Sequence, residues 1–407
     1  MYNKYDIYLF LLISSLATGG IGGSLLLPRI LTLVFLPHFF VLQKDVARRN
    51  VLIIITLLLC YLYLLISYFW TLDTEQGAKD LIYYLIHFIT FVEIVFFAEK
   101  ATNPVKFISI GWTVAFFLTS YIALWEILTD NHLSIVRFDE DVYLHDGSLL
   151  VIRRFASAAY ANFNGYSTFI CFCIPFILSL MMDVKMKRKY RLLSLYCLLF
   201  AIYIVLFNAS RGAILSAAVI LFIYISIALH NGSDFDKNKL FLLLLILIIG
   251  FVLFGQSALE NIVIKLRGTE MLDSSNREGI WIRAWEVFIN SYCFGTGVGS
   301  LQVALQNVSG RNTVIVTHNM FLEVLVQYGI IGITILVVFI LKLFRKALYL
   351  KKTNTMKPLL LSALISLPIS TIIDSTYLMN PSVWMLFASL YVVAVYPSCN
   401  KAATLNL

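Results

Sequence analysis

The feature that most constrains this chain is a long succession of apolar runs, most of them close to the length of a membrane-spanning helix. A helix needs about 20 mostly apolar residues to cross the hydrocarbon core of a bilayer. Of the 407 residues, 60% are hydrophobic and only 13% are charged, against about 25% charged residues in a typical soluble domain. The chain is therefore predicted to be an integral membrane protein. The runs cover residues 7–27, 28–43, 51–70, 81–98, 107–128, 165–182, 192–208, 212–230, 240–256, 319–341, 359–373 and 382–396.

These runs predict an all-α, polytopic membrane protein with about twelve transmembrane helices, folded as a single domain over residues 1–407. Basic residues are concentrated in alternate connecting segments, as the positive-inside rule describes. KDVARRN (44–50), KMKRKYR (185–191) and the segment 342–357 are predicted to face the cytoplasm, together with both chain termini. The opposite connections are then exterior, and the principal one covers residues 257–317.

The basic residues on the two predicted faces differ in kind. Eleven of the 31 Lys and Arg residues fall in exterior segments, and nine of these eleven are arginine. A guanidinium group stays charged and can bind phosphate or carboxylate through two parallel hydrogen bonds. We therefore hypothesise that the exterior face binds a polyanion. Interfacial anchoring of arginine, or chance in a small sample, is the alternative explanation of the bias.

Arg211 is the most informative of these arginines, because almost no loop separates the apolar runs on either side of it. The sequence FNASRGAILSAAVILF (207–222) places it at or just inside the exterior boundary of the membrane. A basic residue at membrane depth is costly and normally faces the bundle interior or a water-filled cavity. With Asn208 and Ser210 beside it, Arg211 is a candidate anion ligand. The alternative is an arginine at a helix end that extends its side chain to the interface.

The principal exterior segment contains SSNREGIWIRAWEVFIN (274–290), which has the pattern of an amphipathic helix. Ser275 and Glu278 have the spacing of a capping box. The pattern predicts a helix on the membrane surface or over the mouth of the bundle, with Arg277 directed toward the bundle. The predicted apolar face comprises Ile280, Trp281, Ala284, Trp285 and Phe288. The following GTGVGS (295–300) lacks the third glycine of a dinucleotide-binding loop and is predicted to form a tight turn.

The sequence THNMFLEVLVQYGIIG (317–332) places a histidine at the start of an apolar helix that also carries a carboxylate. Thr317 is predicted to cap this helix, and the helix dipole would favour the neutral ring that a general base requires. A bound diphosphate would have the opposite effect. Glu323 lies about 7.5 Å further along the helix and about 140° around it, so it is expected to pair with a basic residue such as Arg211 instead of His318. A purely structural histidine at the interface is the alternative.

The order of these motifs resembles that of the O-antigen ligase and O-antigen polymerase superfamily of bacterial envelope glycosyltransferases. SRGA is followed by an exterior segment with R…RxW and GxGxG, and then by HNxxLExLxxxGIIG. YFWTLD (68–73) and RRFASAAYANFNGYS (153–167) add to the resemblance, which covers most of the chain. The resemblance implies a helical bundle in the bacterial cytoplasmic (inner) membrane, with its active site on the exterior face. It also implies transfer of a glycan from undecaprenyl diphosphate to an acceptor hydroxyl, without a nucleotide sugar, a metal ion or another cofactor.

The resemblance further implies roles for particular residues. His318 would be the catalytic base on the acceptor, Arg211 would bind the diphosphate, and Arg277 or Arg283 would supply a second arginine to it. Direct displacement of the diphosphate would invert the anomeric configuration of the transferred sugar. The residues expected in supporting roles are Glu323, Asn319, Arg154 and Arg153.

Three functions remain open from the sequence. A polymerase, the first expectation, would join lipid-linked repeat units into O-antigen, capsule or exopolysaccharide. A ligase would transfer finished glycan from the same donor to lipid A core or another acceptor, so the two enzymes differ only in their acceptor. A polysaccharide transporter or flippase belongs to a different class, whose folds often contain internal repeats and broken midplane helices; no internal repeat is visible in this sequence. The partners expected are the lipid-linked glycan, its acceptor and membrane lipid, and not nucleic acid.

Overall fold

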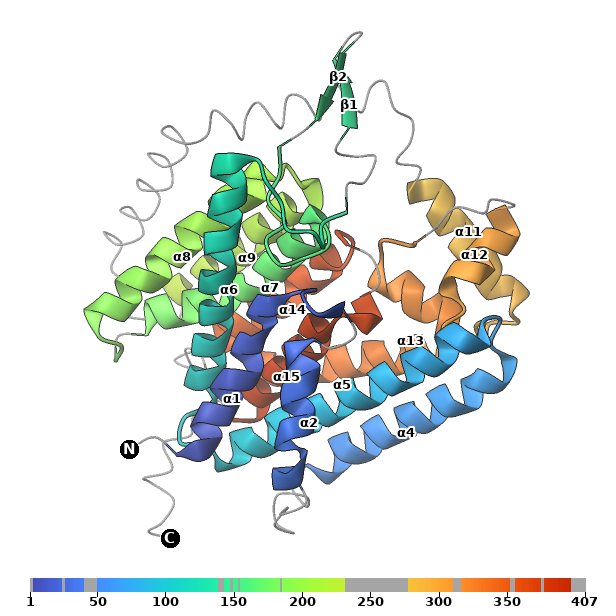
Figure 1. Ribbon diagram of the computed structural model, residues 1–407. Helices are drawn as coiled ribbons and strands as arrows, with labels where there is room; N and C mark the ends of the chain where they lie inside the picture. The colour runs from blue at the N-terminus through green and yellow to red at the C-terminus, as the bar shows by residue number, and fades with distance from the viewer. Residues whose placement is uncertain are drawn as a thin grey trace.

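A computed structural model describes residues 3–23, 26–39, 50–137, 143–146, 149–152, 154–183, 185–230, 277–309, 316–351, 356–374 and 377–396. Within these ranges the chain is almost wholly helical (Figure 1). The predicted helix at 240–256 and part of the predicted exterior segment lie outside the described residues. The α-helices are α1 (Lys4–Ser14), α2 (Leu27–Phe39), α4 (Val51–Ser67), α5 (Thr74–Lys100), α6 (Pro104–Thr129), α7 (Phe163–Met182), α8 (Arg188–Phe207), α9 (Arg211–His230), α11 (Arg277–Asn290), α12 (Leu301–Ser309), α13 (Met320–Tyr349), α14 (Met356–Ser370) and α15 (Pro381–Val395).

Short elements lie between the helices. The 3-10 turns are η1 (Ser15–Thr18), η3 (Tyr68–Trp70) and η5 (Tyr377–Met379). A small antiparallel hairpin pairs β1 (Tyr143–Asp146) with β2 (Leu149–Ile152), with Tyr143 opposite Ile152. This hairpin lies within a segment that was predicted to be exterior and stands apart from the helices in Figure 1. The hairpin was not predicted, but it lies in a connection between α6 and α7 and is not part of the helical bundle.

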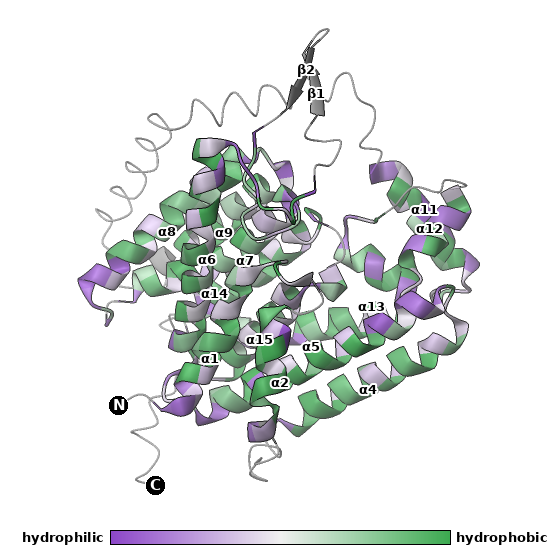
Figure 2. Ribbon diagram, in the orientation of Figure 1, coloured by the Kyte–Doolittle hydropathy of each residue, from purple (hydrophilic) through white to green (hydrophobic). Residues whose placement is uncertain are grey.

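Among the described residues, six helices are long and apolar enough to cross a membrane: α4 with η3, α5, α6, α7, α8 and α13. Four shorter apolar helices, α2, α9, α14 and α15, pack among them. Apolar residues dominate these helices in Figure 2. The prediction of a polytopic helical membrane protein is thus confirmed, whereas the number of about twelve transmembrane helices and the side of each terminus stay predictions.

Polar caps fix the points where several helices begin. The Asp73 carboxylate accepts a hydrogen bond from the backbone amide of Gln76 (2.9 Å) at the start of α5. The Asn162 side chain accepts one from the amide of Gly165 (2.6 Å) at the start of α7. A side-chain acceptor before a helix satisfies amides that have no partner inside the helix, so it defines where the helix starts.

The first apolar run ends earlier than predicted. α1 and η1 end at Thr18, and the next residue, Gly19, has a φ of +51°. A Cβ at Gly19 would overlap the carbonyl oxygen of Ala159, and the amide of Gly20 donates to that same oxygen at 2.6 Å. The predicted helix over residues 7–27 is therefore α1 with η1, followed by a glycine turn that packs against the loop preceding α7.

The bundle is densest around α7, which is enclosed by α6, α8, α9 and α14 (Figure 1). Of its most apolar 18-residue window, 94% is buried, against 22% for the corresponding window of α4. A helix that keeps its apolar residues exposed is expected to face lipid. We therefore place α7 in the centre of the bundle and α4 at its lipid-facing edge.

α13 is interrupted at Gly329, where φ is +58° and ψ is −154°. The amide that follows the break donates to the carbonyl oxygen of Cys293 (2.9 Å). The carbonyl oxygens of Val326 and Gln327, just before the break, accept amides from residues 293–299 at 2.9 and 3.0 Å. The backbone groups that a broken membrane helix exposes are thus satisfied by another part of the chain.

The loop that fills this break contains GTGVGS, which forms a tight turn as predicted. Gly295, Gly297 and Gly299 have φ values of +83°, +90° and +78°. A Cβ at Gly297 would lie 2.6 Å from the carbonyl oxygen of Ser67, and a Cβ at Gly299 would overlap the backbone of Gly77. Glycine is required here because the turn lies against the backbones of α4, α5 and α13.

Replacing Gly329 with alanine is expected to destabilise the protein. A side chain at this φ and ψ costs about 1–3 kcal/mol in backbone strain alone, and the new Cβ would overlap backbone atoms of Cys293 and Phe294. Thermal unfolding in detergent, followed by tryptophan fluorescence, measures the loss. Gly20→Ala is the matched control, because a Cβ there meets no atom closer than 3.7 Å. Equal melting temperatures for the two variants would contradict the expectation.

Candidate functional site

The turn that follows α14, residues 371–374, brings three distant segments of the chain together. The amide at the start of α13 donates to the carbonyl oxygen of Thr371 at 3.1 Å. Arg277, the first residue of α11, donates from Nη1 to the carbonyl oxygen of Ile372 at 3.0 Å. A Cβ at Gly212, near the start of α9, would lie 3.0 Å from the side chain of the next residue in the turn. We call residues 371–374 the hub turn.

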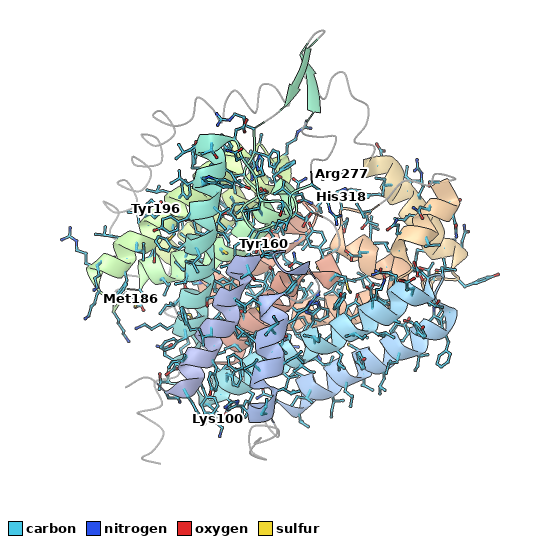
Figure 3. The ribbon with its side chains drawn as sticks, in the orientation of Figure 1. Lys100, Tyr160, Met186, Tyr196, Arg277 and His318 are labelled. Atoms are coloured by element: carbon cyan, nitrogen blue, oxygen red, sulfur yellow. The ribbon has the colours of Figure 1, made fainter. Side chains whose placement is uncertain are left out.

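His318 lies immediately before α13, on the same side of the molecule as Arg277 (Figure 3). Its backbone is in the left-handed region, with a φ of +47°, and its side chain is partly exposed. The cap of α13 is Asn319, whose side chain accepts from the amides of Phe321 (2.9 Å) and Leu322 (3.3 Å). The prediction that Thr317 caps the helix was wrong, because α13 begins at Met320 and Asn319 is the residue that precedes it. His318 therefore precedes the helix by two residues instead of belonging to its first turn.

Thr317 has a different role from the predicted cap. It is buried, and its carbonyl oxygen accepts a hydrogen bond from the indole Nε1 of Trp281 at 2.9 Å. Its hydroxyl donates to the carbonyl oxygen of Asn319 at 3.2 Å. Since Trp281 belongs to α11, this helix is bonded to the residue before His318 as well as to the hub turn.

The structure distinguishes the two arginines of α11. Arg277 contacts the hub turn, as the predicted orientation toward the bundle requires. Arg283 lies six residues later, about 9 Å further along the helix and about 120° around it. Arg277 is therefore the arginine of α11 that lies beside His318 and the hub turn.

Arg211 is the first residue of α9, and α8 ends only four residues earlier, at Phe207. The short connection predicted from the sequence is thus confirmed. Ser210 donates from its hydroxyl to Asn164 Oδ1 at 3.3 Å, and Gly212 packs against the hub turn. Arg211 itself is exposed, and the start of α9 contacts the same turn as Arg277.

Glu323 does not pair with Arg211, as the sequence suggested. Its side chain is 3% exposed, and its carboxylate accepts hydrogen bonds from the amides of Tyr377 (3.0 Å) and Leu378 (3.4 Å). Those amides begin η5, and the first amides of a helical turn have no partner within it. Glu323 therefore supports the backbone next to the hub turn instead of neutralising an arginine.

Tyr377 links η5 to the hub turn from the other direction. Its phenol oxygen accepts the amide of Asp374 (2.5 Å) and donates to the carbonyl oxygen of Ser370 (3.3 Å). Burial raises the pKa of the Tyr377 phenol well above its ordinary value, and the nearby Asp374 carboxylate acts in the same direction. The phenol is consequently neutral at physiological pH and acts as a fixed hydrogen-bonding group.

Two further arginines, Arg153 and Arg154, were expected to support the site. Arg153 lies outside the described residues. Arg154 is exposed, donates to the carbonyl oxygen of Ile127 and lies 3.5 Å from an oxygen of Asp130, at the end of α6. Both of these contacts are at the C-terminal end of α6.

The sequence analysis missed a buried carboxylate that shapes the loop before α7. Glu126 is fully buried and accepts hydrogen bonds from the amides of Ser157 (2.8 Å) and Ala158 (2.7 Å). Asn208 holds the same loop through both the amide and the carbonyl of Ala156, at 2.8 and 2.9 Å. An acidic residue in the last turn of an apolar run was the available signal, since such a residue at membrane depth normally has a partner.

An apolar cavity lies below this region, between α4, α5, α13 and α15. It encloses about 130 Å³, and Tyr84, Tyr328, Leu378 and Trp384 are among the residues that line it. Leu378 lines the cavity and also donates its amide to Glu323, so the cavity lies next to the backbone that Glu323 holds. Among the described residues, no group of three or more His, Cys, Asp or Glu is arranged to hold a metal ion.

These features define a polytopic helical membrane protein with a cationic site at one end of its bundle. A family model described as O-Antigen ligase matches residues 196–337, a region that contains Arg211, Arg277, His318 and Glu323. The Teichuronic acid biosynthesis protein TuaE of Bacillus subtilis (strain 168) is 22% identical over 328 residues, which cover 77% of this chain and 65% of that protein. Both comparisons support the resemblance to the O-antigen ligase and O-antigen polymerase superfamily that the motif order indicated. It spans about two thirds of the length of this relative.

Proposed function

We propose that the protein is a membrane glycosyltransferase that moves a glycan from undecaprenyl diphosphate to an acceptor hydroxyl. The observation that carries the proposal is the meeting of Arg277, the start of α9 with Arg211, and the segment of His318 around the hub turn. All three belong to the region that matches the O-antigen ligase family. Transfer from a diphosphate leaving group requires cations that stabilise the departing diphosphate and a base that accepts the proton of the acceptor.

The proposed reaction has three elements. Arg211 and Arg277 stabilise the negative charge that grows on the diphosphate as the anomeric bond breaks. His318 accepts the proton of the incoming acceptor hydroxyl, which then attacks the anomeric carbon from the side opposite the diphosphate. Such an attack inverts the anomeric configuration, and it needs no metal ion. Glu323 and Asn319 support the reaction by fixing the backbone on either side of the hub turn.

The carrier lipid also fits the proposed site. We propose that the apolar cavity below the hub turn takes part of the polyprenyl chain, because its lining is almost wholly apolar. The diphosphate would then lie at the hub turn and the glycan outside the bundle. We propose that the site lies on the exterior face of the cytoplasmic membrane, because α11 and α12 belong to the segment that is expected to be exterior.

We propose a polymerase of repeat units in preference to a ligase. The relative in Bacillus subtilis is named for the biosynthesis of teichuronic acid, and we propose that this chain likewise acts in making an envelope polysaccharide. A ligase that transfers finished glycan to lipid A core or another acceptor would use the same donor and the same residues. The product therefore distinguishes the two functions.

A transporter is the second class, and the break in α13 is the feature that could favour it. Broken helices in transporters expose carbonyl groups and amides that bind substrate or coupling ions. At Gly329 the carbonyls of Val326 and Gln327 instead accept amides from residues 293–299, and the amide after the break donates to Cys293. The break is therefore occupied by the protein's own backbone, which argues against a transport site there.

The purified protein, supplied with an undecaprenyl-diphosphate-linked repeat unit, tests the proposal. A polymerase gives a ladder of products from the donor alone, whereas a ligase gives a single product that requires an added acceptor. Arg211→Ala is expected to lower the rate by about 10²–10³-fold, the usual effect of removing one group that stabilises developing charge. Arg283→Ala is the matched control and is expected to retain most of the activity. Absence of any transfer by the folded wild-type protein, or equal loss in both variants, would count against the proposed site.

A further inference from the structure

α11 has two apolar faces, although the sequence pattern predicted one. The inward face buries Ala284, Val287 and Phe288, and the first two pack against residues of α12 and α13. On the outward side Ile282 is 62% exposed and Trp285 is 54% exposed. Trp285 had been predicted to share the buried face with Ala284. A helix surrounded by water on that side would carry polar residues there, so the outward face requires an apolar or amphipathic partner.

The outward face continues beyond α11 onto the end of α4. Tyr292 and Phe294 in the turn after α11 are 86% and 58% exposed, and Phe69 in η3 is 88% exposed. The hydroxyl of Tyr63 donates to the carbonyl oxygen of Phe294 at 3.3 Å, which ties this turn to α4. Figure 1 shows α11 and α12 beside the end at which α4 and α5 are joined.

We propose that this surface, formed by Phe69, Ile282, Trp285, Ile289, Tyr292 and Phe294, inserts into the headgroup region of the bilayer. We call it the α11 outer surface. Tryptophan and tyrosine are enriched at the membrane interface because their rings are amphipathic. Phe69 follows directly on α4, the span that is least buried within the bundle, so the surface is continuous with one that already faces lipid.

The polar residues at the edge of the α11 outer surface agree with an interfacial depth. Glu286 lies about 40° around α11 from Ile282 and Asn290 about 80°, and both side chains are exposed. A carboxylate is poorly tolerated in the hydrocarbon core but is well solvated among lipid headgroups. The surface is therefore expected to enter the membrane only as far as the boundary between headgroups and acyl chains.

Lipid contact at this surface would position the site as well as the helix. α11 is bonded to the hub turn by Arg277 and to the residue before His318 by Trp281. If one face of α11 lies in the bilayer, these two hydrogen bonds hold the hub turn and the residue before His318 at a constant height relative to the membrane. The inference does not depend on the glycan-transfer reaction.

Fluorescence of single cysteine variants tests the inference. Ile282→Cys and Ile289→Cys, in a Cys293→Ser background, are labelled with the environment-sensitive probe NBD and reconstituted in vesicles of phosphatidylcholine and phosphatidylglycerol. Gln302→Cys on the exposed side of α12 is the matched control. Protein without an added cysteine corrects for labelling of native thiols.

The expected result is that phosphatidylcholine brominated in its acyl chains quenches the probe at Ile282 and Ile289 at least about twofold more than at Gln302. Aqueous iodide should quench in the reverse order. Strong iodide quenching at Ile282 would show an aqueous surface and overturn the inference. Resistance of Ile282 to both quenchers would show that another part of the protein covers α11, and would overturn it equally. Loss of glycan transfer with these quenching patterns intact would leave the inference standing while contradicting the proposed function.

Discussion

Replacing His318 with alanine is expected to lower the rate of glycan transfer by about 10²–10⁴-fold, the range that a positioned general base contributes. The proton of the acceptor hydroxyl would then have no acceptor on the protein, while the arginines proposed to bind the diphosphate stay in place. The loss should therefore appear in kcat, with little change in the affinity for the lipid-linked donor. Initial rates with purified protein and a defined undecaprenyl-diphosphate-linked oligosaccharide measure both quantities.

A second histidine provides the control. His38 lies near the end of α2, where its ring is hydrogen-bonded to the hydroxyl of Tyr8 at 3.1 Å. His38→Ala makes the same chemical change away from the hub turn and is expected to keep most of the activity. If His318→Ala transferred glycan at the wild-type rate, or if it weakened donor binding as much as it slowed transfer, His318 would not be the base.

Replacing Glu323 with alanine is expected to destabilise the protein by about 2–6 kcal/mol. The amides of Tyr377 and Leu378 would both lose their buried acceptor, and a buried donor left without a partner costs about 1–3 kcal/mol. Glu323→Gln keeps one carbonyl oxygen and should lose less. Unfolding in mixed detergent micelles, followed by tryptophan fluorescence, measures the difference in free energy.

The matched control for this change is Glu286→Ala. Glu286 is exposed on α11, and an exposed substitution of this kind usually changes stability by less than about 0.5 kcal/mol. The comparison also separates two roles of Glu323. A Glu323→Ala variant as stable as the wild type but without activity would show that the carboxylate takes part in the reaction and does not support η5.

The parts of the protein that follow local patterns were predictable from the sequence. The membrane helices arise from runs of apolar residues, and most of their observed bounds lie within a few residues of those runs. The abrupt connection before Arg211 and the turn at GTGVGS were also visible, because a charge at membrane depth and closely spaced glycines each have few structural explanations.

The predictions that failed depended on contacts between distant segments. Glu323 was expected to bind an arginine. The amides that it binds belong to η5, which lies between two apolar runs and has no sequence pattern that predicts it. The contact of Arg277 with the hub turn could not be foreseen either, because Ile372 comes 95 residues later in the chain. Asn319 and Thr317 are both residue types that commonly cap helices, and the sequence alone does not show that the helix begins after Asn319.

The break at Gly329 divides α13 into two segments with separate attachments. The first, which follows His318, is fixed by the hub turn, by η5 and by the glycine turn; the second is the long lipid-facing part. A continuous helix would transmit any tilt along its whole length, and membrane helices tilt as bilayer thickness changes. Since a helix bends most easily where its hydrogen-bond ladder is interrupted, the second segment can follow the membrane while the histidine keeps its position. The position of the proposed catalytic base would then be independent of the tilt of the second segment.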